Sequence, residues 1–273
     1  MRCLPLPDWP RVDSSNGCLS KILGIKMSNE PENINVEVKA YLERLQRCDE
    51  LINLVQLAYD QFEFSKIPLV LPTEYTLVCE LFAAPAGFLS TREAFGFIAR
   101  KGNTLKIIYR GTDSWGDWFT DSRIDQVEHR LGMVHRGGWD LYSQMAADVK
   151  AAVDQHPNYD IDISGHSLGC WPAIYTAADL YQRKINPIVF APPRPGNAEF
   201  AENLNRLVPN LVCLINSEDM VPTLPLPVMG ERVYSHAGNL LVFTYSTGSD
   251  VKSHELPAYQ KFVSELLAIS IHP

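Results

Sequence analysis

The sequence predicts an α/β domain in which a mainly parallel β-sheet is covered by helices on both faces. Apolar residues make up 46% of the 273 residues, which is enough for a sizeable core. Segments of period two, typical of strands, alternate with segments of helical period along most of the chain. We see no internal repeat and no linker in this alternation, so we expect one domain over residues 36–273.

The N-terminal third combines an irregular leader, a helix and a hairpin. Residues 1–35 are rich in Pro, Ser and Asn, which predicts a loosely ordered leader. From Val38, apolar residues recur at helical spacing and predict an amphipathic helix that ends near Tyr59. Strands are expected at 76–82, 94–99 and 104–109, and the four residues 100–103 suit a hairpin between the last two.

The remainder alternates helices and strands, as a parallel sheet requires. Helices are expected at about 140–154, 168–183, 198–206 and 256–269, and strands at 159–164, 187–191, 211–216 and 240–245.

Charge and hydropathy exclude some classes of partner. The formal charge of −8 and the pI near 5.4 argue against nucleic acid, which favours a basic surface. No run of about 18 apolar residues is present that could span a bilayer. The first thirty residues contain no uninterrupted apolar segment of a secretion signal. We therefore expect a cytoplasmic protein without a transmembrane segment.

The segment DISGHSLG (162–169) predicts a nucleophile at Ser167. It places Ser167 on a turn between an alternating strand and a helical segment. Such a turn requires glycine at 165 and 169, because a side chain there would collide with the neighbouring strand or helix. It projects the hydroxyl from the carboxyl edge of the sheet, and the helix N-terminus below favours developing negative charge.

A serine nucleophile needs a base and a carboxylate that orients the base. In a parallel sheet these groups meet Ser167 only at the carboxyl ends of the strands. The acid is therefore expected after the strand at 211–216, where Glu218 and Asp219 are both candidates.

Three histidines follow Ser167 in the chain. His254 follows the strand at 240–245 and is the preferred base. His236 precedes that strand and would lie at the wrong edge unless its segment folds back as a hairpin. His272 lies too close to the end of the chain. His166 is interpreted as a turn residue hydrogen-bonded to its surroundings, because adjacent side chains point apart.

The strand at 104–109 ends in Arg110, Gly111 and Thr112, beside the expected position of Ser167. The backbone N–H groups of Thr112 and Leu168 are candidate donors to the oxyanion of an acyl-transfer reaction. Alternatively, Gly111 and Thr112 merely begin a loop and cap a helix.

The next segment, DSWGDWFTDSRI, places Trp115, Trp118 and Phe119 on one face of a short helix. These side chains are either ordinary core contacts or the apolar face of a mobile lid. Such a lid would cover the acyl site in water and turn toward lipid at an interface.

These motifs, in this order, resemble the class 3 lipase family. The resemblance rests on IIYRGTDSWGDWFTD, DISGHSLG, INSEDMVPTLP and SHELPAY, and it extends over nearly everything after about residue 38. It implies an α/β-hydrolase fold with a lid over the active site. It also implies hydrolysis of carboxylic esters, usually of glycerolipids, without a metal or organic cofactor.

The resemblance also implies the roles of single residues. Ser167 corresponds to the nucleophile, Asp219 to the acid and His254 to the base. Thr112 and Leu168 correspond to the oxyanion hole, and residues 113–121 to the lid.

Two positions depart from the family pattern. The family usually continues GHSLG with Gly-Ala, where this chain has Cys170 and Trp171, and it has an aromatic residue where this chain has Gly138. We expect an elbow helix further from its neighbours, or an acyl groove narrowed by Trp171.

The expected function is that of a lipase or carboxylesterase acting on acylglycerols through an acyl-enzyme. Phospholipase A1-type and feruloyl-type esterase activities, or acyl transfer, remain open, as does a non-catalytic lipase-like scaffold. The expected partners are a lipid or other ester substrate and, through the lid, a lipid interface.

Overall fold

A seven-stranded sheet forms the centre of the molecule. The computed structural model describes residues 31–63, 68–84, 92–112 and 125–271. The strand order is β1-β2-β3-β6-β7-β8-β11, antiparallel from β1 to β3 and parallel from β3 onward. The strands are β1 (Thr76–Ala83), β2 (Glu93–Lys101), β3 (Thr104–Tyr109), β6 (Asp160–His166), β7 (Ile185–Phe190), β8 (Val212–Asn216) and β11 (Asn239–Phe243). The predicted mostly parallel sheet is confirmed.

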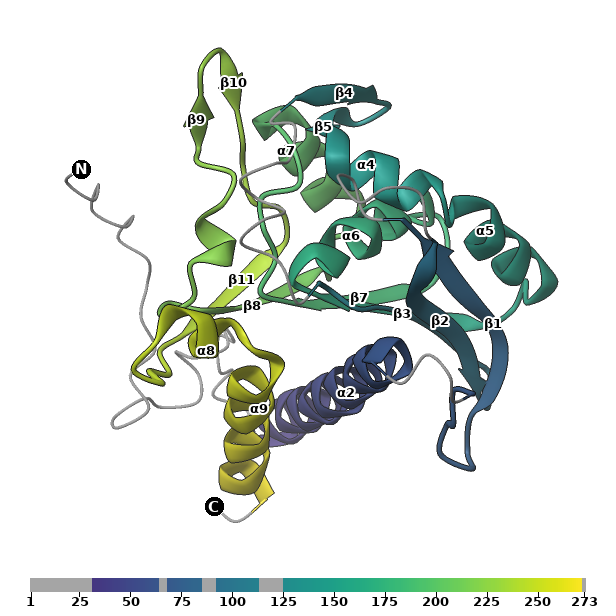
Figure 1. Cartoon of the computed structure of the whole chain (residues 1–273). Coiled ribbons are helices and arrows are strands. Elements are labelled where there is room, and N and C mark those ends of the chain that lie inside the picture. The colour runs from purple at the N-terminus through teal and green to yellow at the C-terminus, as the bar shows by residue number, and fades with distance from the viewer. Residues whose placement is uncertain (1–30, 64–67, 85–91, 113–124, 272–273) are drawn as a thin grey trace.

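Helices cover both faces of this sheet (Figure 1). On one face lie α2 (Pro31–Glu63) and α9 (Leu256–Ile271). On the other face lie α4 (Arg136–Ser143), α5 (Ala146–Gln155), α6 (Cys170–Asp179) and α7 (Ala198–Leu207). Alternate residues of the strands therefore enter one of two apolar cores, as in other three-layer α/β folds.

Helix α2 is longer than its apolar pattern indicated. It begins at Pro31, so residues 31–35 of the predicted leader are helical, and it continues to Glu63 rather than ending near Tyr59. The rest of the leader lies outside the described residues, and the domain boundary stays a prediction. The apolar positions from Tyr41 to Val55 are mostly buried against the sheet and α9.

Two predicted helices have different bounds in the structure. The helix expected at 140–154 is a pair, α4 and α5, separated by a turn at Gln144 and Met145. The helix expected at 168–183 starts with a 3-10 turn, η1 (Ser167–Gly169), and α6 ends at Asp179. It ends early because the Arg183 N–H donates to the Leu180 carbonyl at 2.8 Å, in a turn that leads directly into β7.

Several short elements escaped prediction because two to five residues are too few to establish a period. They are two hairpins, β4 (Gln126–His129) with β5 (Gly132–His135) and β9 (Val228–Met229) with β10 (Arg232–Val233), and the helix α8 (Asp250–His254). The predicted β2–β3 hairpin is present with a tighter turn than expected, because the strands extend to Lys101 and from Thr104. Helix α8 matters most, since it ends at His254.

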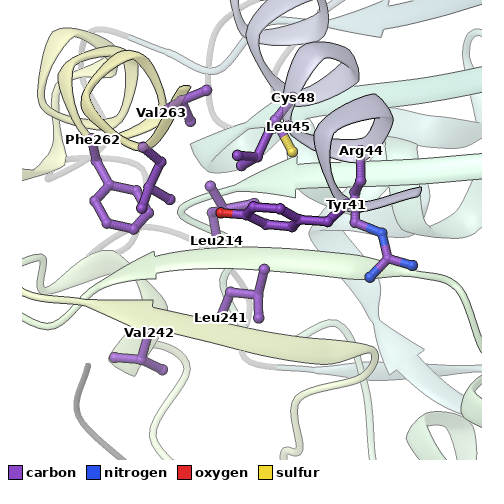
Figure 2. A pocket seen from close by; sticks show the side chains of 10 residues that line it. Tyr41, Arg44, Leu45, Cys48, Leu214, Leu241, Val242, Phe262 and Val263 are labelled. Atoms are coloured by element: carbon purple, nitrogen blue, oxygen red, sulfur yellow. The ribbon is translucent and has the colours of Figure 1, made fainter. Parts of the chain in front are cut away.

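A small apolar cavity of about 40 Å³ lies where α2 and α9 cross β8 and β11 (Figure 2). Tyr41, Leu45 and Cys48 of α2 line it together with Leu214 of β8 and Phe262 of α9. This volume holds at most a water or two, and its walls offer water few polar partners. The cavity is therefore an imperfection of packing rather than a ligand site.

Candidate active site

Ser167 lies on a strained turn between β6 and α6. Its backbone φ of +56° is in the left-handed region, which residues other than glycine rarely adopt. A Cβ at Gly165 would lie 2.3 Å from the Gly169 carbonyl oxygen, and a Cβ at Gly169 would lie 2.3 Å from the Arg110 carbonyl oxygen. Only glycine fits at either position, which confirms the predicted need for both. The turn holds the Ser167 side chain at the carboxyl end of β6.

The side chains of Ser167, His254 and Asp219 meet at this edge of the sheet. The Oγ of Ser167 lies 2.8 Å from Nε2 of His254, and Nδ1 of His254 lies 2.8 Å from Oδ2 of Asp219. All three residues are buried. A carboxylate only accepts, so Nδ1 carries the proton and Nε2 is left to accept the Ser167 hydroxyl. The structure thus brings together the three residues predicted from the sequence.

Asp219 is held by donors besides the histidine. Its Oδ2 also accepts the Tyr259 hydroxyl at 2.6 Å, and its Oδ1 accepts the Val221 N–H at 2.8 Å. Burial, together with the charge of Asp219, raises the pKa of Tyr259 well above its ordinary value, which keeps this hydroxyl a donor. Sequence reasoning missed this role of Tyr259, because a tyrosine in α9 carries no specific signal.

The competing candidates lie elsewhere. Glu218 is exposed to solvent, whereas Asp219 points inward. His236 donates from Nε2 to the Pro222 carbonyl at 2.8 Å, and burial followed by the charge of Arg194 lowers its pKa to about 3. His272 lies outside the described residues.

The end of β3 runs directly beside Ser167. A Cβ on Gly111 would lie 2.8 Å from the Ser167 Cβ, and Thr112 follows immediately. Leu168, the second predicted oxyanion donor, directly follows Ser167 and is buried. Buried Arg110, whose role was not predicted, donates to the carbonyls of Ala94 at 2.7 Å and Gly111 at 2.5 Å. This guanidinium fixes the strand end on which Thr112 is placed.

A pocket of about 370 Å³ opens beside His254, between α2 and the α8–α9 segment. Its walls include Tyr59, Thr112, His166 and His254, and its carboxylates are Glu63 and Glu255. Among the described lining residues there is no lysine or arginine. The imidazole of His254 thus faces a polar, acidic space.

Trp171 packs in the core and does not line this pocket, so the structure gives no support to a groove narrowed by its indole. It is fully buried, its ring stacks on His135 at 4.1 Å between centroids, and its Nε1 donates to the Arg194 carbonyl at 3.1 Å. A Cβ on Gly138 would lie 2.8 Å from the indole ring atoms. The two departures from the family pattern therefore compensate each other. The large side chain is at position 171 instead of position 138, and the Trp171 ring packs directly against Gly138.

The predicted lid cannot be placed. Trp115, Trp118 and Phe119, with the rest of residues 113–121, lie outside the described part of the chain. Their contact with substrate or a lipid interface stays a prediction. Within the described ranges, no group of three or more His, Cys, Asp or Glu side chains could hold a metal ion.

The mostly parallel sheet and the serine on its strand-to-helix turn define an α/β-hydrolase fold. The family model Lipase (class 3) matches residues 106–229 of this chain. The chain is 31% identical to the lipase of Rhizomucor miehei over 149 residues, which is 50% of this chain and 40% of that protein. It is 27% identical to secreted mono- and diacylglycerol lipase A of Penicillium cyclopium over 181 residues, which is 62% of this chain and 58% of that one.

A solved triacylglycerol lipase described as having a serine protease triad as its catalytic centre superposes with a TM-score of 0.58 at 25% identity. The superposition covers 71% of this chain and 79% of that one. In sequence, by contrast, the matched region spans less than two thirds of the curated relatives.

Proposed function

We propose that this protein is a serine hydrolase that cleaves carboxylic esters of lipids, acylglycerols in particular. The observation that carries the proposal is the unbroken hydrogen-bonded line from Ser167 through His254 to Asp219, 2.8 Å at each step. Relatives named as lipases and as mono- and diacylglycerol lipases support the substrate class. The predicted roles of nucleophile, base and acid are proposed for these three residues.

The reaction begins when Nε2 of His254 takes the Ser167 proton and Oγ attacks the ester carbonyl carbon. The N–H groups of Thr112 and Leu168 stabilise the resulting oxyanion. His254 then passes its proton to the alcohol oxygen as the ester C–O bond breaks, which leaves an acyl-serine. A water molecule, deprotonated by the same imidazole, attacks this ester and releases the carboxylic acid and Ser167.

The pocket favours uncharged alcohols such as glycerol over anionic head groups. Because His254 protonates the leaving oxygen, the alcohol part of the ester lies on the His254 side of Ser167. The pocket on that side carries Glu63 and Glu255 and no described lysine or arginine. These two carboxylates repel the negatively charged phosphate diester of a phospholipid and therefore weaken its binding. This favours acylglycerols over the phospholipids of the phospholipase A1-type alternative.

The first test uses Ser167→Ala, with Ser164→Ala, three residues earlier on β6, as the matched control. We expect Ser167→Ala to lose all measurable hydrolysis of p-nitrophenyl butyrate and tributyrin, and labelling by a fluorophosphonate probe. Ser164→Ala should retain both. Wild-type protein that is folded but neither labelled nor active would instead identify a non-catalytic scaffold. Faster hydrolysis of phosphatidylglycerol than of acylglycerol would contradict the substrate class.

Location and interface contact remain proposals. Among the described residues, no helix is both long and apolar enough to cross a membrane. The cytoplasmic location expected from the sequence has no support from the relatives, several of which are named as secreted. Fractionation of the source cells checks it. Activity on tributyrin below and above its solubility limit checks whether residues 113–121 act as a lid at an interface.

A further inference from the structure

Two side chains that the proposed mechanism does not use, Tyr59 and His166, connect the parts of the candidate site. His166 ends β6, is buried, and stacks on His254 with ring centroids 4.9 Å apart. Its Nε2 lies 2.9 Å from the His254 carbonyl oxygen, and its Nδ1 lies 2.8 Å from the Tyr59 hydroxyl. That hydroxyl also accepts the Gly111 N–H at 2.9 Å.

The partners fix the direction of every hydrogen bond in this line. A carbonyl oxygen only accepts, so Nε2 of His166 carries a proton and donates it to His254. In a neutral imidazole the other nitrogen, Nδ1, then accepts from the Tyr59 O–H. Burial, followed by the nearby charge of His254, lowers the pKa of His166 well below its ordinary value, in agreement with a neutral ring.

The line joins four segments that are far apart in the chain. Gly111 precedes Thr112, the proposed oxyanion donor, and His254 is the proposed base. Tyr59 near the end of α2 and His166 on β6 hold these two backbone positions on either side of Ser167. A shift of either position lengthens a contact that the transition state needs.

We propose that Tyr59 and His166 are positioning residues, which set the spacing of the oxyanion loop and the base around Ser167. The inference rests on the proposed hydrolase function. It assigns a role to the histidine inside GHSLG and to a tyrosine of α2, to which the proposed mechanism gives no chemical step.

The test compares Tyr59→Phe with Tyr75→Phe, a matched control at the other end of the α2–sheet interface. The Tyr75 hydroxyl donates to Glu50 of α2 at 2.6 Å. Each variant therefore removes one tyrosine hydroxyl that forms a hydrogen bond between α2 and a segment next to the sheet. Fluorophosphonate titration counts the active sites, and kcat is expressed per site. We expect Tyr59→Phe to lower kcat for p-nitrophenyl butyrate about 10-fold with an unchanged KM, and Tyr75→Phe to change kcat less than twofold.

A second pair of variants tests whether Tyr59 acts through His166. His166→Phe keeps the stacked ring and loses both hydrogen bonds, and its kcat should fall at least as far as that of Tyr59→Phe. The double variant should lose less than the product of the two single losses. A Tyr59→Phe kcat within twofold of wild type, or a change in KM alone, would overturn the positioning role. Wild-type protein that fails to label would instead end the hydrolase proposal, and the positioning role with it.

Discussion

Two buried aspartates, Asp162 and Asp219, show how differently one fold can stabilise a carboxylate. Asp162 lies in the middle of β6, under α2, and is 2% exposed. Asp219 lies at the carboxyl edge of the sheet and is 3% exposed. The two are equally buried, but they have different partners.

Asp162 is paired with a permanent cation. Its Oδ2 lies 2.8 Å from Nζ of Lys106, its direct neighbour on β3, and its Oδ1 accepts Asn186 of β7 at 3.0 Å. Two residues of α2 complete the cluster: Glu50 lies 2.7 Å from the same Lys106 nitrogen, and Nε of Arg47 lies 3.6 Å from Oδ1 of Asp162. This network is electrostatically satisfied in the resting protein and anchors α2 to the sheet.

Asp219 has no lysine or arginine ion-pair partner among the described residues. Its donors are a tyrosine, a backbone N–H and the imidazole of His254. In the proposed mechanism, a full positive charge faces it only when His254 takes the Ser167 proton. The difference teaches that a buried carboxylate stabilises the fold when its counter-charge is permanent, and a transition state when that charge is transient.

The largest expected effect comes from removing the charge of Asp219. Asp219→Asn should lower kcat about 10³–10⁴-fold, because an amide neither orients His254 nor stabilises the imidazolium. Asp162→Asn should leave kcat per titrated active site within twofold. Steady-state kinetics on p-nitrophenyl butyrate check both. Equal losses of kcat in the two variants would remove the distinction between them.

Removing the permanent cation should affect stability alone. Lys106→Met removes the buried cation between Asp162 and Glu50 and leaves them with only partly exposed partners, Arg47 at 3.6 Å from Asp162 and Lys101 at 3.0 Å from Glu50. We therefore expect the free energy of unfolding to fall by about 3 kcal/mol. Lys150→Met is the surface control, since its pair with Asp154 is exposed and should contribute under about 1 kcal/mol. Urea unfolding gives both values. A loss below 1 kcal/mol for Lys106→Met would show that the network does not hold α2.

The uncharged pair Gly138 and Trp171 sharpens the comparison, because its coupling should not depend on salt. Trp171→Ala should cost about 3–5 kcal/mol by opening a cavity, and Gly138→Phe alone should also destabilise through overpacking. The double variant should recover about 2 kcal/mol relative to additive losses. A thermodynamic cycle at low and high salt measures this. Additive losses of unfolding free energy would show that a large side chain at position 138 does not fill the space left by Trp171.

The smallest effect concerns Glu50 and pH. Burial alone would raise its pKa, but hydrogen bonds from Lys106 and Tyr75 and the Lys106 charge outweigh burial and lower the pKa to about 2. A lowered folded-state pKa gives stability that is complete above the unfolded value of about 4.5. The full change would contribute about 3 kcal/mol, and screening of this partly exposed carboxylate by solvent reduces it to about 2 kcal/mol, which is lost as pH falls through the folded-state pKa.

Unfolding free energies at several pH values check this contribution. The difference between wild type and Glu50→Gln should be constant down to about pH 4.5 and shrink below it. Glu199→Gln, exposed on α7, serves as the control and should show a small difference at every pH. A Glu50 difference that grows on acidification would contradict the sign.

Much of the fold and the core of the candidate site followed from local sequence patterns. The seven strands of the central sheet alternate or run apolar over five or more positions, and this pattern identified them. The glycines at 165 and 169 identified the turn at Ser167, although only Gly165 is required by a contact within the turn, and Gly169 is required by the distant Arg110 carbonyl. Short elements such as α8 and the two small hairpins have too few residues for a period, so they were missed.

The sequence by itself determined which chemical groups are available and at which edge of the sheet they gather, because strand direction and the order of elements are encoded locally. Only the tertiary structure showed why Asp219 and not exposed Glu218 contacts His254, matched Trp171 to Gly138, and joined Tyr59 to His166. Each of these depends on contacts between segments distant in the chain. Such contacts arise from packing and burial, which no local pattern of residues encodes.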